Sequence, residues 1–358
     1  MPAISYKQIL RELEKIGKQP RKNQREYMGH VQMLTQMLGQ LSDKKLNKVM
    51  EELKPFVSDN DLFFAFLMAN TIGSALERGG DPNIAGREII KLGKKIVYRA
   101  HEFGIGYEKF AKTSPNVNPQ SLMQQYGKLH PQQGQAIRLI GQLGPCLGAV
   151  FSSSKELRKL SANDADLYDT LLYLARHMEG LRYVTEAFFI MDDTPFVVLY
   201  PEGKRGWIVQ TEGITNLHQF DALLSAKIVG DPSEGKVPGE VPSKEALESL
   251  TVPGVSRRMS FKENFELANW TGLTDDNKLV SPFIAATPEG HKWLSHDQIP
   301  ADIKELSRQR VLLIGTPKIG RSTNAQKTFT HMKADLKIER EMSAEEVEDW
   351  IETIHANR

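Results

Sequence analysis

The stretch Glu186-Ala-Phe-Phe-Ile-Met-Asp-Asp-Thr-Pro-Phe-Val-Val-Leu-Tyr-Pro-Glu-Gly-Lys-Arg-Gly-Trp-Ile-Val-Gln210 marks the point at which the hydrophobic pattern of the chain changes. It contains three runs of β-branched and aromatic residues, at 187–191, 196–200 and 207–210. Turn-forming residues separate them, at 192–195 and 201–206. Runs of this kind bounded by turn residues are typical of strands. We therefore predict a three-stranded antiparallel meander that begins at about Ala187.

Upstream of this stretch, from residue 4 to about 180, apolar residues recur at helical spacing. Asp59 or Asn60 is expected to cap a helix that ends at Gly79-Gly80. Further helices are expected at about 83–103, 119–129, 132–160 with a break at Gly144-Pro145, and 164–181. The pattern is compatible with a helical bundle or with a short solenoid.

Downstream of the stretch, helical and strand patterns alternate. We expect a helix at about 216–229 with Asn216 as its cap, strands at Phe265–Trp270, Arg310–Ile314 and Leu336–Glu341, and a last helix at 343–355. Ser343 and Glu346 have the spacing of a capping box. Residues 230–256 are rich in Gly and Pro around a short helix at 243–250, and we expect them to form a mobile loop. The predicted fold is α+β, with a helical domain at 1–183 and an α+β domain at 184–358.

Composition limits the partners of this chain. Its 358 residues carry 46 Lys+Arg and 45 Asp+Glu, a net charge of +1, which provides no general attraction for nucleic acid or an anionic membrane. Cys146 is the single cysteine, which excludes an internal disulfide and indicates a reducing compartment. The amino terminus has no apolar stretch of signal-peptide length, and no window approaches the roughly 18 apolar residues of a spanning helix. We expect a cytoplasmic protein with no membrane or nucleic-acid partner.

The carboxy-terminal half resembles a family of uncharacterised bacterial proteins. The resemblance covers about residues 195–352. The matching pieces are Arg205-Gly-Trp207, Glu212-Gly-Ile214, Asn269-Trp-Thr-Gly-Leu273, Arg310 to Pro317, Arg321-Ser-Thr-Asn324 and Leu336 to Arg340. The resemblance implies a bacterial protein with a helical amino-terminal region, and it brings no known activity.

One segment looks like a phosphate-binding loop. Gly315-Thr-Pro-Lys-Ile-Gly-Arg-Ser322 follows a predicted strand and matches such a loop at both glycines and the hydroxyl, but has Arg where the loop has Lys. Residues 323–330 are poor helix formers, and only 36 residues follow Ser322. We interpret the segment as a turn between strands with Lys318, Arg321 and Lys327 facing solvent. Phosphate binding at this loop is left open.

Histidines give no metal pattern. His291 and His296 with Asp297 lie within seven residues, but a spacing of five separates the two imidazoles on a helix, and no third ligand pattern recurs nearby. We interpret these histidines as surface residues. No metal and no cofactor are predicted.

Large amphipathic residues at turns provide the candidate binding surface. Trp207 follows Arg205-Gly206, and Trp270 precedes Thr271-Gly272, positions at which an indole ring either covers the core or anchors a ligand. The candidate surface for a ligand or partner consists of Arg205, Trp207, Trp270, Arg321 and Asn324. No catalytic residue is assigned.

The function expected from the sequence is a non-catalytic cytoplasmic module that binds another protein or a ligand. One alternative is a small-molecule enzyme, in which Arg205 and Arg321 hold an anionic substrate and a carboxylate at 186–212 acts as base. A second alternative is a neutralising partner of a bacterial toxin. The sequence leaves all three open.

Overall fold

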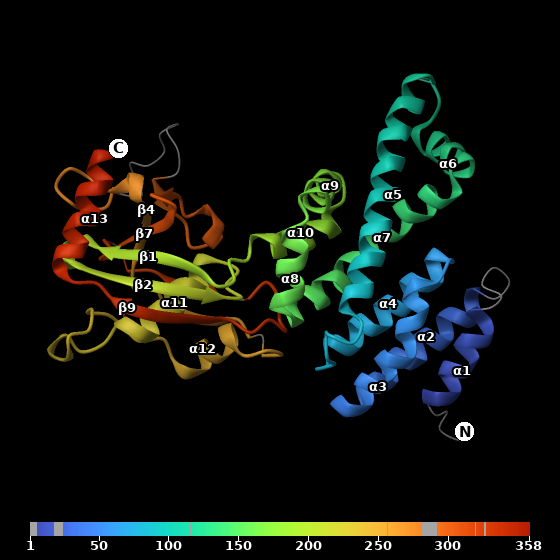
Figure 1. The fold of residues 1–358 in the computed structure, drawn as a ribbon, viewed down its shortest axis with the longest axis horizontal. Helices are drawn as coiled ribbons and strands as arrows, with labels where there is room; N and C mark the ends of the chain where they lie inside the picture. Colours follow the sequence, from blue (N-terminus) through green and yellow to red (C-terminus); the bar gives the residue numbers. More distant parts are fainter. Residues whose placement is uncertain are drawn as a thin grey trace. The chain divides into compact units, whose positions relative to one another are not determined.

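The computed structural model describes residues 6–17, 24–114, 116–255, 257–280, 292–318, 320–325 and 327–358, in two compact units, Met1–Phe188 and Phe189–Arg358 (Figure 1). The first unit is helical and the second combines helices with a mainly antiparallel sheet, which confirms the predicted α+β class. The division follows Phe188 rather than Tyr183. Separate folding of the halves stays a prediction. No helix in the described ranges is long and apolar enough to cross a membrane.

The first unit is a succession of helices joined by short connections. They are α1 (Tyr6–Gly17), α2 (Gln24–Leu38), α3 (Asp43–Leu53), α4 (Leu62–Leu76), α5 (Gly86–Lys112), α6 (Pro119–Leu129), α7 (Pro131–Ser153), α8 (Lys155–Ala162), α9 (Ala165–Ala175) and α10 (Arg182–Glu186). The cap of α4 is Asp61 rather than Asp59 or Asn60, because its Oδ1 accepts the Phe63 and Phe64 amides at 2.9 and 3.0 Å. The predicted break at Gly144-Pro145 is wrong: α7 continues to Ser153.

Helix α4 lies at the centre of this unit. It is buried almost all round, as expected for a helix whose every face is apolar. Glycine allows α7 to pack closely against it: a Cβ built on Gly73 of α4 would lie 3.2 Å from Cys146 Cα. A Cβ on Gly93 of α5 would likewise lie 3.0 Å from the Leu147 side chain. Small residues therefore hold α4 and α5 against the middle of α7.

The same kind of packing explains why Pro145 does not end α7. Proline has no N–H, so the Gly141 carbonyl lacks its usual helical donor. Gly180 packs against this carbonyl instead, since a Cβ built on Gly180 would lie 3.1 Å from the Gly141 oxygen. Likewise, a Cβ built on Gly144 would lie 2.5 Å from the Gly180 carbonyl oxygen. Tertiary packing of the helix outweighs the local preference of proline.

The second unit is built on one sheet of seven strands in the order β5-β4-β7-β1-β2-β9, with β6 also paired to β7. Among the strand pairs of the described residues, only β1–β7 is parallel, and β3 and β8 form a separate antiparallel pair. The strands are β1 (Thr194–Tyr200), β2 (Arg205–Glu212), β3 (Met259–Lys262), β4 (Glu266–Asn269), β5 (Trp293–Leu294), β6 (Glu305–Leu306), β7 (Gln309–Gly315), β8 (Ser322–Ala325) and β9 (Asp335–Glu341).

The predicted meander is only half correct. β1 and β2 form the expected hairpin, but Ala187–Phe189 is a 3₁₀ turn that continues α10. The ring of Phe188 packs against Phe151 and Tyr168 in the helical unit, with centroids 5.7 and 5.5 Å apart. The start of the apolar run, through Phe188, therefore belongs to the helical unit, whereas Met191 packs on the core of the second unit, and β7 takes the place beside β1.

A helix covers each face of the large sheet. Alternate residues of β1 point to opposite faces: Phe196 and Val198 pack with α11 (Leu217–Ile228), whereas Val197 and Leu199 pack with α13 (Ala344–Ala356). Both predicted caps are confirmed, since Asn216 accepts the Gln219 amide and Ser343 with Glu346 forms a capping box. Within 230–256, α12 (Lys244–Thr251) matches the predicted short helix, and the mobility of this segment stays a prediction.

A pair of glycine variants tests the packing of α7. Gly144→Ala forces a Cβ against the Gly180 carbonyl, so it should lower the free energy of unfolding by about 1–3 kcal/mol. Gly104→Ala in α5 meets only Tyr173, at 3.9 Å, and should raise it by up to about 1 kcal/mol through helix propensity. Urea unfolding followed by circular dichroism measures both. Equal effects of the two substitutions would contradict this packing.

Candidate functional site

The structure places the two predicted tryptophan anchors on opposite faces of the sheet. Trp207 is 2% exposed and belongs to the core under α11, whereas Trp270 packs on the core under α13. The Trp270 indole donates to the Glu305 carbonyl at 3.1 Å. These two residues therefore do not form one binding surface.

Arg205 is fully engaged within its own unit. Its Nε and Nη2 donate to Glu341 at 2.8 and 2.6 Å, and its Nη1 donates to the Gly235 carbonyl at 2.7 Å. The guanidinium lies 5.0 Å from the centroid of the Trp207 ring. Arg205 links the segment around Gly235 to β2 and β9 of the sheet, so its guanidinium is not free to hold a substrate.

Arg321 and Asn324 lie at the pair β3–β8. Arg321 is exposed, and its guanidinium lies 5.9 Å from the centroid of the Trp293 ring. The backbone of Asn324 pairs with Ser260, and its side chain lies outside the described residues. The segment Gly315–Ser322 connects β7 to β8, so a strand follows it, where a phosphate-binding loop is followed by a helix.

Lys327 differs from the prediction. It was expected to face solvent, but it is 3% exposed and its ammonium donates to the Val252 carbonyl. Burial penalises the charged form of the ammonium and lowers the pKa of Lys327 to about 8. Lys318 is exposed, as predicted.

The buried lysine gives the protein a pH-dependent stability. Between about pH 8 and 10.5 the unfolded chain holds a proton at Lys327 that the folded chain lacks, so the folded state gains stability as pH rises through this window. We compare the free energy of unfolding of the wild type with that of Lys327→Met. The wild-type value minus the variant value should rise by about 1–3 kcal/mol between pH 7.5 and 10. Urea unfolding at several pH values measures the difference, with exposed Lys318→Met as control. A difference that does not change with pH would contradict the assignment.

A row of alternating carboxylates and imidazoles includes two residues of α11, Asp221 and His218. His296 Nε2 lies 3.2 Å from Asp221 and its Nδ1 lies 3.6 Å from Glu263. His218 Nδ1 lies 3.7 Å from the other oxygen of Glu263, and its Nε2 lies 3.0 Å from Asp297. We call Asp221, His296, Glu263, His218 and Asp297 the histidine row. Its imidazoles stack with centroids 5.3 Å apart.

The histidine row holds three segments together. Asp221 is fully buried on α11, His296 is 6% exposed, and Glu263 follows β3. The Leu217 and His218 amides also donate to the carbonyls of Gln298 and His296 at 2.8 and 2.9 Å. The interpretation of His296 as a surface residue is therefore wrong, and His291 lies outside the described residues. Among the described residues, no three His, Cys, Asp or Glu side chains are placed to hold a metal ion.

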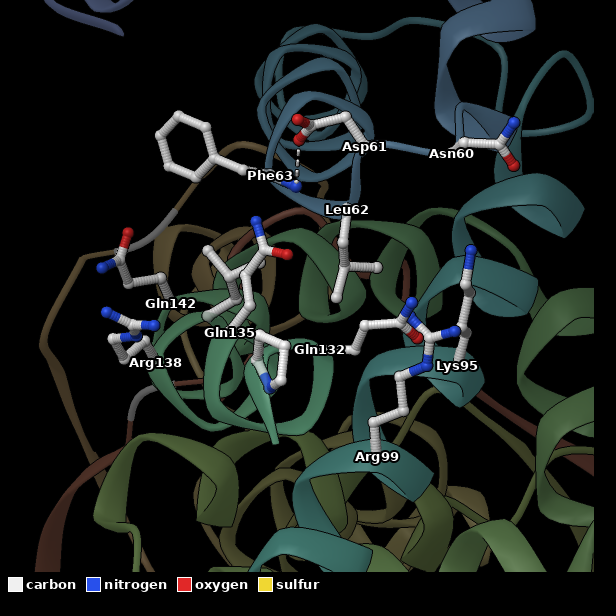
Figure 2. Close-up of a pocket in the computed structure, with 12 residues that line it drawn as sticks. Asn60, Asp61, Leu62, Phe63, Lys95, Arg99, Gln132, Gln135, Arg138 and Gln142 are labelled. Atoms are coloured by element: carbon white, nitrogen blue, oxygen red, sulfur yellow. Dashed lines mark hydrogen bonds between the residues drawn. The ribbon is translucent and has the colours of Figure 1, made fainter. Parts of the chain in front are cut away.

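The helical unit contains a cavity of about 850 Å³ between the start of α4, the middle of α5 and the first half of α7 (Figure 2). Twelve residues line it: Asn60, Asp61, Leu62, Phe63, Lys95, Arg99, Pro131, Gln132, Gln135, Arg138, Leu139 and Gln142. We call this cavity the basic cleft. Leu62 and Leu139 are buried, and the other side chains are wholly or partly accessible.

Three cations and one carboxylate line the basic cleft. Lys95 and Arg99, one turn apart on α5, are half-buried, and neither has a hydrogen bond or ion pair within the described part of the chain. Figure 2 shows their head groups on the side of the cleft occupied by Gln132, with Arg138 and Gln142 at the other side. Asp61 uses its Oδ1 to cap α4. The cleft therefore presents unneutralised positive charge.

Sequence reasoning missed this site. Lys95 and Arg99 look like ordinary charges on an amphipathic helix, and the glutamines that face them come from another helix about 40 residues later. No local motif connects the two sets.

No family model, no curated protein and no solved structure matches this chain. The resemblance of residues 195–352 to uncharacterised bacterial proteins stays a prediction. The functional argument therefore depends on the geometry of the chain itself.

Proposed function

We propose that this protein is a non-catalytic interaction module of the cytoplasm, whose helical unit binds an acidic segment of another protein in the basic cleft. The observation that carries the proposal is the pair Lys95 and Arg99, half-buried and without an acidic partner in the described residues. Partly desolvated charges are stabilised most by an opposite charge, because the dielectric around them is lower than in water. A carboxylate of a partner supplies that charge.

The polar lining of the basic cleft suits a peptide. Gln132, Gln135 and Gln142 each offer an amide donor and an amide acceptor, the same groups that a peptide backbone requires. The volume of about 850 Å³ lies within the range of ligand-binding clefts in general. A peptide that presents carboxylates to the cations and its backbone to the glutamines would use both features.

Charge distribution argues against nucleic acid as the ligand. The net charge of the protein is +1, and the cleft itself has three cations, Lys95, Arg99 and Arg138. Long polyanions are bound through many cations spread over a surface, with a steep dependence on salt. A short acidic segment needs only the three cations of the cleft.

The enzyme alternative has weaker support. It requires Arg205 and Arg321 to face one substrate, but Arg205 is bonded to Glu341 and Gly235 while Arg321 lies against Trp293. The toxin-neutralising alternative is one form of the proposed module, since it also needs a surface for a partner protein. No residue of the cleft distinguishes it from other partners.

Charge removal in the cleft tests the proposal. A fluorescein-labelled hexaglutamate peptide should bind the wild type, more weakly at 300 mM than at 50 mM NaCl because salt screens the charges. The double variant Lys95→Gln/Arg99→Gln should bind at least about tenfold more weakly, because it loses two charged partners. Fluorescence anisotropy measures both affinities.

The matched control is Lys91→Gln/Lys109→Gln, which removes the same charge from exposed positions of α5 outside the cleft. It should bind nearly as well as the wild type. Equal losses in the two double variants would show that only general charge matters and would contradict the cleft as the site. Tight binding of ATP with no binding of hexaglutamate would replace the peptide by a small phosphate ligand.

A further inference from the structure

A second cavity, of about 470 Å³, lies beside the basic cleft between α5, α6 and α7. Its lining is mostly apolar and includes Phe103, Met123, Gly127, Gly134, Ile137 and Arg138. Of the residues that the structure describes, no Asp or Glu lines it, and Lys128 and Arg138 are its charged members. We call this cavity the apolar groove. Figure 1 shows α6 beside the carboxy-terminal half of α5, where the groove is located.

Two glycines create the apolar groove. A Cβ built on Gly134 of α7 would lie 3.0 Å from the Cα and carbonyl oxygen of Gly127 on α6, so the two helices touch at this point. Because neither residue has a side chain, space remains above the ring of Phe103, which is buried and lies edge-on to Tyr126 with centroids 5.1 Å apart. The buried ring of Phe103 thus forms part of the floor of the groove.

Several apolar side chains of α5, α6 and the segment between them are exposed. Met123 is 45% exposed and Leu129 is 64% exposed, both on α6. Ile105 and Val117, near the ends of the same helix pair, are 38% and 39% exposed. Met123 is the one of these four that lines the groove, so its apolar side chain is accessible to a partner there.

Arg138 connects the two cavities, because it lines both. Its Nε donates to the Gly134 carbonyl at 2.9 Å, which holds the side chain along α7. A ligand that leaves the basic cleft on this side passes the guanidinium and enters the apolar groove. The positive border of the groove therefore continues the charge pattern of the cleft.

We infer that the partner segment has two parts, a run of carboxylates in the basic cleft and a large apolar side chain, such as Phe or Leu, in the apolar groove, with Arg138 between them. This inference rests on the proposed function and names the chemistry of the partner more closely. Charge complementarity selects an acidic partner, and the uncharged, aromatic floor of the groove selects an apolar anchor.

Two peptides separate this inference from the proposed function. The first is the labelled hexaglutamate, and the second carries Gly-Gly-Phe-Leu added to the same peptide, at either end in separate preparations. One extended form should bind the wild type about tenfold more tightly than hexaglutamate, the gain expected when one large apolar side chain is buried. Fluorescence anisotropy on the full-length chain measures both affinities.

Gly127→Leu fills the groove. Its Cβ would meet only the Phe103 ring, at 3.9 Å, so the helix pair accommodates the start of the side chain. This variant should lose the gain of the extended peptide and bind hexaglutamate as the wild type does. Gly29→Leu, with nothing within 4 Å of its Cβ on α2, is the matched control and should keep the gain. Met123→Glu, at an exposed position, is a second variant and should also lose the gain.

The outcomes distinguish the two claims. Binding of hexaglutamate with no gain in either extended form overturns the inference and leaves the proposed function in place, as does a gain that survives both Gly127→Leu and Met123→Glu. Failure of all the peptides to bind the wild type overturns both claims.

Discussion

The close contact of α4 and α5 with α7 is the constraint on which the helical unit depends. Gly73 meets Cys146 in the later halves of α4 and α7, and the starts of the same two helices face each other across the basic cleft, so the helices run in the same direction. Helices α4 and α7 contact each other at Gly73 and diverge toward their amino-terminal ends, where the cleft lies. Gly93 holds α5 against Leu147, and Lys95 follows two residues later. The close packing of the helix backbones therefore determines where the cations lie.

In the α+β unit, polar groups serve mainly to hold segments in place. The histidine row joins α11, the end of β3 and the 296–298 segment, and Arg205 joins β2 to Glu341 and Gly235. Arg205, which the sequence analysis assigns to ligand binding, thus forms its hydrogen bonds with other residues of the chain. The helical unit, by contrast, leaves Lys95 and Arg99 without partners in its described residues, which is why we assign partner binding to that unit.

Local signals made parts of the fold predictable. The caps at Asn216 and at the Ser343–Glu346 box could be predicted because a cap depends on three or four adjacent residues. Predictions failed where distant packing decides. Phe188 packs in the helical unit instead of starting a strand, Pro145 remains inside α7, and His296 is buried beside Asp221 and Glu263. The basic cleft had no signal in the sequence, because its cations and its glutamines lie on separate helices that only the folded chain brings together.

The most direct test is to observe where an acidic segment binds. In a ¹⁵N-labelled sample, nuclear magnetic resonance resolves the side-chain amides of Gln132, Gln135 and Gln142, which line the cleft on α7, and of Gln210, which lies in β2. Added hexaglutamate should shift the three cleft amides and leave Gln210 unchanged. Shifts confined to the α+β unit, around Arg205 or Arg321, would contradict the assignment of binding to the helical unit.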